Sequence, residues 1–174
     1  MSTQLVITLI ATDRPGIVEQ VADVIGRCEG NWLESSLSRL GGQFAGILLV
    51  EIAREREESL RAALAALADK GIRATLDQAG VPDDARRPGQ RLLLSLVAND
   101  RRGIIGEISR VLARREVNLD ELHTSTENAP MSGDLLFHAS AEIVLPEGIG
   151  REELRLALEE LSDDIMVEIE DLDS

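Results

Sequence analysis

The sequence has few aromatic residues and little positive charge. Its 174 residues include one tryptophan, two phenylalanines and no tyrosine, and 18 lysines and arginines stand against 32 aspartates and glutamates. Base-stacking platforms need aromatic side chains, and nucleic acids are bound mainly by cations that neutralise phosphates. The formal net charge of −14 therefore argues against direct binding of DNA or RNA.

Cysteine and long apolar runs are also scarce. Cys28 is the only cysteine, so the chain can form neither an intrachain disulfide nor a cysteine-based metal cluster. Apolar runs such as residues 47–50 are far shorter than the roughly 18 residues of a membrane span. The N-terminus lacks the features of a signal peptide. We therefore expect a cytoplasmic protein that has no metal or other cofactor and no membrane partner.

What the sequence does contain is a short motif that occurs twice. Asp-Arg-Pro-Gly-Ile occupies residues 13–17, and Asp-Arg-Arg-Gly-Ile occupies residues 100–104, which is 87 positions later (100 minus 13). Each copy follows an apolar, strand-like run and precedes apolar residues at helical spacing. This pattern predicts a strand–loop–helix junction, where free backbone N–H groups at the helix start favour an anionic group.

The first half of the chain is predicted to form six elements in the order βαββαβ. Glycines at 41 and 42 indicate a hairpin turn, Pro15 suits the first position of a helix, and Lys70-Gly71 suits a helix end. Strands are expected at 5–11, 32–40, 44–53 and 72–77, and helices at about 16–29 and around 60–67.

The second half repeats this order. At the offset of 87, Ile104, Ile108 and Val111 match the first-helix residues Ile17, Val21 and Val24, and Asn118 matches Asn31. Val50-Glu51-Ile52 resembles Ala141-Glu142-Ile143 at an offset of 91, which predicts about four added residues in the second hairpin. The second helix matches at an offset of 94. So many registered matches indicate a tandem duplication.

The chain is therefore divided into a first domain at 1–78, a linker at 79–90 and a second domain at 91–174. The linker is rich in proline, glycine and charge and has no apolar period. Each domain is predicted to be α+β and ferredoxin-like, with two helices on one face of an antiparallel sheet. Apolar strand residues such as Leu48, Val50 and Leu135 suggest that the uncovered face is partly apolar, so we expect the copies to pack together and the chain to form a homodimer.

These motifs resemble the ACT domain over residues 4–77 and 91–171. The resemblance rests on the Asp-Arg-Pro-Gly-Ile motif between the first strand and the first helix, and on the Gly-Asn pair that opens the second strand. Two such domains that fill a short chain are similar to the glycine cleavage system transcriptional repressor family. That family implies an amino-acid ligand and contact with a DNA-binding regulator protein rather than with DNA.

An amino acid offers a carboxylate and an ammonium group. Backbone N–H groups at the glycine-containing loops could hold the carboxylate, the aspartates could meet the ammonium, and the two asparagines could contact either group. The candidate ligand-binding residues are Asp13, Arg14, Gly16, Ile17, Asn31, Asp100, Gly103, Ile104 and Asn118.

Structural roles for the same residues stay open. The aspartates could serve only as turn or helix-capping residues, the asparagines could end helices in a left-handed conformation, and the arginines could point to solvent. Cys28 is expected in the core, and His123 and His138 at the surface.

No phosphate-binding glycine loop, metal-ligand spacing or nucleophile elbow is present, so we predict no enzymatic activity. The favoured function is a metabolite-sensing regulator of transcription. The alternative is an amino-acid-responsive regulatory subunit of a metabolic enzyme.

Overall fold

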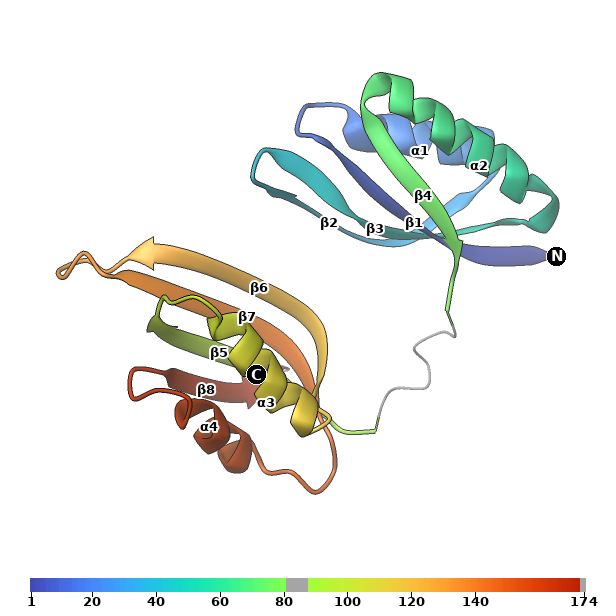
Figure 1. Cartoon of the computed structure of the whole chain (residues 1–174). Helices are drawn as coiled ribbons and strands as arrows, with labels where there is room; N and C mark the ends of the chain where they lie inside the picture. The colour runs from blue at the N-terminus through green and yellow to red at the C-terminus, as the bar shows by residue number, and fades with distance from the viewer. Residues whose placement is uncertain (81–87, 173–174) are drawn as a thin grey trace. The chain divides into compact units, whose positions relative to one another are not determined.

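A computed structural model describes residues 1–80 and 88–172 of the chain. The chain divides into two compact units, Met1–Pro82 (unit 1) and Asp83–Ser174 (unit 2). Each unit is a four-stranded antiparallel sheet with two helices on one of its faces (Figure 1). The predicted ferredoxin-like α+β fold is thereby confirmed. Most of the predicted linker, residues 81–87, lies outside the described residues.

Unit 1 follows the predicted order, with a short 3-10 helix on each side of its second α-helix. The chain begins with a strand, and a glycine in the left-handed region precedes the first helix. Its elements are β1 (Ser2–Thr12), α1 (Ile17–Arg27), β2 (Asn31–Leu40), β3 (Gln43–Ala53), η1 (Arg54–Arg56), α2 (Glu57–Ala66), η2 (Leu67–Lys70) and β4 (Ile72–Gln78).

Unit 2 repeats the arrangement without the 3-10 helices among its described residues. Its elements are β5 (Gln90–Asn99), α3 (Ile104–Arg114), β6 (Asn118–Asn128), β7 (Leu135–Leu145), α4 (Arg151–Glu159) and β8 (Met166–Asp171). No helix in the described part of either unit is long and apolar enough to cross a membrane.

The sheets have the strand orders β2-β3-β1-β4 and β6-β7-β5-β8. The first strand of each unit is therefore central, and the strand after the first helix forms an edge. In unit 1, Leu5 lies opposite Val50, and in unit 2 the equivalent Leu92 lies opposite Ile143. The offset between β3 and β7 is thus 93 (143 minus 50), not the 91 expected from the sequence. The second hairpin contains six extra residues instead of four.

Alternate residues of the strands face the helices and form one apolar core in each unit. Cys28 is part of the first core, as predicted, and is 8% exposed. Leu48 and Val50 were expected on the uncovered face, but both are buried beneath the helices at 1% and 0% exposure. That expectation was wrong. Because β3 is apolar on both faces, its apolar residues do not by themselves show which face is uncovered. Its uncovered face instead presents Ile47, which is 52% exposed, beside Leu49.

Helices α1 and α3 end in the same motif. In unit 1 the N–H groups of Glu29 and Gly30 donate to the carbonyls of Gly26 and Ile25, at 3.0 and 2.9 Å. This is a Schellman arrangement, in which the residue after the cap is left-handed. Glu29 and Glu116 hold that position, with φ of 60° and 55°. The idea that Asn31 and Asn118 are the left-handed residues was therefore wrong, because both open strands.

Candidate functional site

The repeated loop of unit 1 lies between two other turns at one end of the sheet. The N–H of Asp13 donates to the carbonyl of Gly42 in the β2–β3 hairpin at 2.9 Å. The Asp13 carboxylate lies 3.5 Å from the guanidinium of Arg39, which is on the same hairpin. The loop is therefore held against the hairpin through both backbone and side chain.

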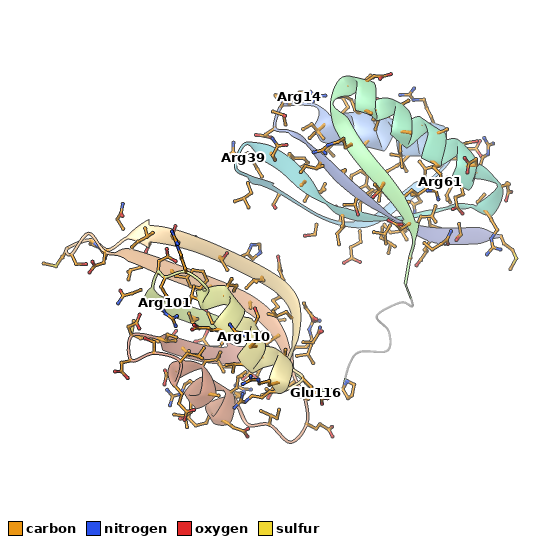
Figure 2. The ribbon with its side chains drawn as sticks, in the orientation of Figure 1. Arg14, Arg39, Arg61, Arg101, Arg110 and Glu116 are labelled. Carbon is orange, nitrogen blue, oxygen red and sulfur yellow. The ribbon has the colours of Figure 1, made fainter. Side chains whose placement is uncertain are left out.

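Arg14 joins the loop to the end of the second helical segment. Its guanidinium donates to the carbonyl of Lys70 at 2.5 Å (Figure 2). That carbonyl ends η2, just before Gly71 turns the chain into β4 with φ of 76°. Arg14 thus does not simply point to solvent: it satisfies a carbonyl at a helix end, where cations are favoured.

Gly16 precedes α1 with φ of 90°, and Gly103 precedes α3 with φ of 86°. This left-handed conformation favours glycine, since other residues carry a Cβ that crowds the backbone. Within the described chain, no side chain caps either helix. The aspartates therefore do not act as helix caps, and Pro15 lies outside its helix instead of at the first helical position. The first-turn N–H groups of α1 therefore stay available for an anion, whereas in α3 the N–H of Ile104 already donates to the carbonyl of Arg101 at 3.4 Å.

The loop of unit 2 has the same backbone but different side-chain partners. The N–H of Asp100 donates to the carbonyl of Leu135 at 2.8 Å, which reproduces the contact between Asp13 and Gly42. Arg101 forms two hydrogen bonds with Glu107, at 2.9 and 2.5 Å. This pairing lowers the pKa of Glu107 and raises that of Arg101. Arg101 is therefore already neutralised within the unit, unlike Arg14.

In unit 2, Asp164 takes the role that Arg14 has in unit 1, where it links the loop to the turn before the last strand. It lies in the turn between α4 and β8 and accepts hydrogen bonds from the hydroxyl of Ser162 and, at 2.7 Å, from the N–H of Asn99. Both bonds favour the ionised carboxylate and lower the pKa of Asp164. Each unit thus fastens its loop to the turn before its last strand, but with a residue of opposite charge.

The two asparagines lie at the other end of their sheets. Asn31 is opposite Glu51 of β3, which in turn is opposite Gln4 of β1. Asp13 is nine residues further along the chain than Gln4, which corresponds to roughly 30 Å of extended strand. The equivalent register separates Asn118 from Asp100 in unit 2. A single unit therefore brings together the loop residues but not the asparagines.

Sequence reasoning missed several partners of the loops. Arg39, Glu107 and Asp164 all contact a loop or its strand, and the carbonyl of Lys70 accepts the Arg14 hydrogen bond. The sequence offered a weak indication for Glu107 alone, because an acidic residue in the first turn of a helix that follows an arginine-rich loop could pair with one of those arginines. The others approach from distant parts of the sequence and carry no local signature.

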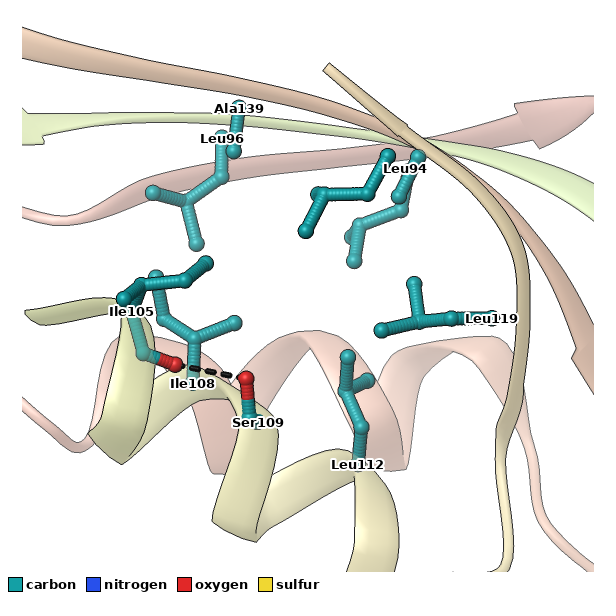
Figure 3. Close-up of a pocket in the computed structure, with 10 residues that line it drawn as sticks. Leu94, Leu96, Ile105, Ile108, Ser109, Leu112, Leu119 and Ala139 are labelled. Carbon is teal, nitrogen blue, oxygen red and sulfur yellow. Dashed lines mark hydrogen bonds between the residues drawn. The ribbon is translucent and has the colours of Figure 1, made fainter. Parts of the chain in front are cut away.

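An apolar crevice is present in unit 2 between α3 and the edge of the sheet (Figure 3). It is narrow, with a cavity volume of about 10 Å³, and Ser109 is its one polar lining residue. The Ser109 hydroxyl donates its hydrogen to the carbonyl of Ile105 at 2.7 Å, so it could meet a ligand only as an acceptor. Ile105 and Leu122 border the crevice and are 38% and 42% exposed.

The crevice exists because unit 2 has smaller side chains than unit 1 at matching positions. Trp32 and Leu48 pack against the core of unit 1, whereas Leu119 and Ala141 occupy the corresponding places in unit 2. Part of the lost volume is recovered by Val117, which stands where unit 1 has Gly30 and is buried in the core of unit 2. The two copies thus share a backbone but differ in how completely their helices are packed.

Each of the two histidines lies beside one acidic side chain. His123 lies 2.7 Å from Glu121, and His138 lies 2.9 Å from Glu127 on the uncovered face of unit 2. Across residues 1–80 and 88–172, no cluster of three or more histidine, cysteine or acidic side chains has metal-binding geometry.

Residues 3–73 match the family model of the ACT domain. The match covers most of unit 1 and confirms the resemblance inferred from the repeated motif. ACT domains are regulatory modules, and unit 2 repeats the fold of the matched unit. No curated protein matches the chain.

Two solved structures share the tandem arrangement over nearly the whole chain. An unknown protein from Galdieria sulphuraria is 25% identical, with a TM-score of 0.78 and 99% coverage of both chains. The crystal structure of a candidate glycine cleavage system transcriptional repressor is 20% identical, with a TM-score of 0.71 and coverage of 97% of this chain and 96% of that one. At this identity the second likeness shows a common fold.

Proposed function

We propose that the protein is a non-enzymatic, cytoplasmic regulator whose two ACT-type units sense an amino acid such as glycine. Amino-acid binding would modulate transcription through contact with a DNA-binding regulator protein. The observation that carries the proposal is the glycine-preceded helix start that recurs in both units. At each start a left-handed glycine leaves first-turn N–H groups without a side-chain cap.

The chemistry of these loops fits the two charged ends of an amino acid. The helix N-terminus attracts the carboxylate through its N–H groups and its dipole. Asp13 and Asp100 lie beside the helix starts, and each has its backbone fixed by the neighbouring hairpin. We propose that these carboxylates meet the ammonium group of the ligand, and that in unit 1 the ligand competes with Arg39, which lies 3.5 Å from the Asp13 carboxylate.

The two loops should not bind equally. In unit 2 Arg101 is neutralised by Glu107, and Arg102 replaces Pro15, so the charge around the helix start differs from that in unit 1. The asparagines would have to come from another unit, because one unit keeps them at the opposite end of its sheet. Ligand binding would then be coupled to the packing of units and would shift the population of a partner-binding state.

The transcriptional part of the proposal is supported by the shared fold with a candidate glycine cleavage system repressor. The net charge of −14 is consistent with action through a protein partner instead of through DNA.

Calorimetric titration of the whole protein with each common amino acid, led by glycine and serine, tests the sensor. We expect one of them to bind, and Asp13→Ala or Asp100→Ala to weaken its binding. Asp77→Ala, on the uncovered face of β4, is the matched control and should bind as the parent does. If none of the amino acids binds, amino-acid sensing is refuted. Binding accompanied by capture of a metabolic enzyme and no transcription regulator would favour the alternative function.

A further inference from the structure

In unit 1 the acid of the repeated loop is paired and the arginine of the loop is not. The Asp13 carboxylate lies 3.5 Å from the guanidinium of Arg39, which extends from the β2–β3 hairpin (Figure 2). Arg14 donates to the carbonyl of Lys70, an uncharged group, so its positive charge is not cancelled by this contact. The loop and its hairpin therefore leave a positive charge, and no free carboxylate, beside the start of α1.

In unit 2 the arginine of the loop is paired and the acid is not. Arg101 forms its two hydrogen bonds with Glu107, which cancels its charge within the unit. The Asp100 carboxylate is exposed and is in no ion pair within residues 88–172. Arg102 is also exposed and, over the same residues, pairs with no acid, so it does not neutralise Asp100 directly. The negative charge of this loop thus stays accessible to a cation.

The strand register shows why unit 2 lacks the first pairing. Arg39 lies opposite Phe44 in the first hairpin, and Thr126 lies opposite Phe137 in the second. The two phenylalanines are equivalent, because each also lies opposite the last residue but one of its unit's first strand. Thr126 therefore stands where unit 1 has Arg39. Its uncharged hydroxyl cannot neutralise Asp100.

We propose that Arg39 determines which class of ligand the unit 1 loop accepts. Because Arg39 already neutralises Asp13, an ammonium group gains less at this loop and a second carboxylate is repelled less. Unit 1 accepts simple carboxylates without an ammonium group, such as hydroxy acids and 2-oxo acids, as well as amino acids. Unit 2, in which Asp100 is unpaired, selects ligands that carry an ammonium group. This inference rests on the proposed function, since it concerns the ligand of the same loops.

Glycine and glycolate are suitable probes, because glycolate has a hydroxyl group where glycine has its ammonium group. Each is titrated into the full ¹⁵N-labelled chain, and the amide shifts of residues 16–19 and 103–106 give a dissociation constant for each loop separately. We expect the preference for glycine over glycolate to be about two- to fivefold greater at unit 2 than at unit 1, the range that one exposed ion pair supplies. Comparing preferences cancels the affinity for the shared carboxylate.

Exchanging the residues at the two equivalent positions tests the role of Arg39. Arg39→Gln should raise the glycine preference of unit 1 by the same factor and leave unit 2 unchanged. Thr126→Arg should lower the glycine preference of unit 2, because the new guanidinium can neutralise Asp100. Arg54→Gln is the matched control. It removes an exposed arginine at the opposite end of the unit 1 sheet and should leave both preferences as in the parent.

The possible results separate the role of Arg39 from the proposed function. If glycine binds but the two loops show the same preference, or if Arg39→Gln leaves the preference of unit 1 unchanged, the role of Arg39 is overturned and amino-acid sensing stands. If neither compound shifts the amides of either loop, both are refuted. An amide spectrum with the dispersion of the parent shows that each variant keeps its fold.

Discussion

Replacing Glu116 with glycine should stabilise unit 2. Glu116 follows the last turn of α3 with φ of 55°, in the left-handed position of the Schellman motif (Figure 2). A left-handed backbone costs a residue with a Cβ roughly 1–2 kcal/mol, and glycine avoids this cost. Part of the resulting stabilisation is lost, because glycine has more conformational freedom in the unfolded chain. A negative charge at a helix C-terminus is also unfavourable by about 0.3–1 kcal/mol. We expect a net gain of about 1 kcal/mol.

The hydrogen bonds of the motif should survive the change, because all of them are made by backbone atoms. A gain of 1 kcal/mol in a unit of this size raises its melting temperature by about 4–8 °C. Thermal unfolding followed by far-ultraviolet circular dichroism measures the shift. Trp32 is the only tryptophan and lies in unit 1, so its fluorescence reports whether unit 1 responds as well.

Glu29→Gly is the matched variant in unit 1. Glu29 has the same backbone but lies 3.1 Å from Arg56, in an exposed ion pair. Losing such a pair costs about 0–1 kcal/mol, so the gain at Glu29 should be smaller than at Glu116. A melting temperature that is unchanged or lower in Glu116→Gly would refute the argument from backbone strain.

Three further changes test the packing and the loop contacts. Gly46→Ala should destabilise unit 1 by about 1–3 kcal/mol, because the new Cβ would lie 2.0 Å from the carbonyl oxygen of Ser36. Urea unfolding followed by Trp32 fluorescence measures the loss, and an unchanged stability would contradict this close approach of the strands. Ala141→Leu should destabilise unit 2 by about 1–3 kcal/mol in the same assay followed by circular dichroism, because the crevice beside it has a volume of only about 10 Å³. A gain in stability would show that α3 can move to admit the larger side chain. Asp164→Asn should destabilise unit 2 at neutral pH. The pKa of Asp164 is lowered from its ordinary value of 3.8, so the carboxylate contributes stability that is present above pH 3.8 and is lost as the pH falls through the lowered pKa. A difference in stability between variant and parent that persisted in acid would argue against this linkage.

The order and type of the elements could be predicted because each has a strong local pattern. The positions of β1 and α1 followed from apolar runs and helical spacing, although β1 begins three residues earlier and α1 ends two residues earlier than predicted, and Gly41 and Gly42 marked the hairpin. The register of β7 could not be fixed in this way. Offsets of 91 and 93 differ by two residues, so both keep the same side chains on the same face of the strand. Only the pairing of Leu92 with Ile143 distinguishes them.

The face assignment of β3 failed for a related reason. Ile47, Leu48, Leu49 and Val50 are consecutive apolar residues, so alternation gives no indication of which face is buried. The loop glycines were predicted from their motif, and their positive φ angles explain why glycine is used. The contact between Arg14 and Lys70 joins residues 56 positions apart, and the separation of Asn31 from the loop depends on strand order. Neither property is encoded locally.

The central claim is that the two helix starts bind the carboxylate of an amino acid. Nuclear magnetic resonance of the ¹⁵N-labelled protein, titrated with glycine, tests it at the level of single amides. The account predicts concentration-dependent shifts at the N–H groups of residues 16–19 or 103–106, with little change at the hairpin tip of 129–134. A glycine titration that leaves the amides of both helix starts unmoved, or that shifts only residues far from them, would contradict it.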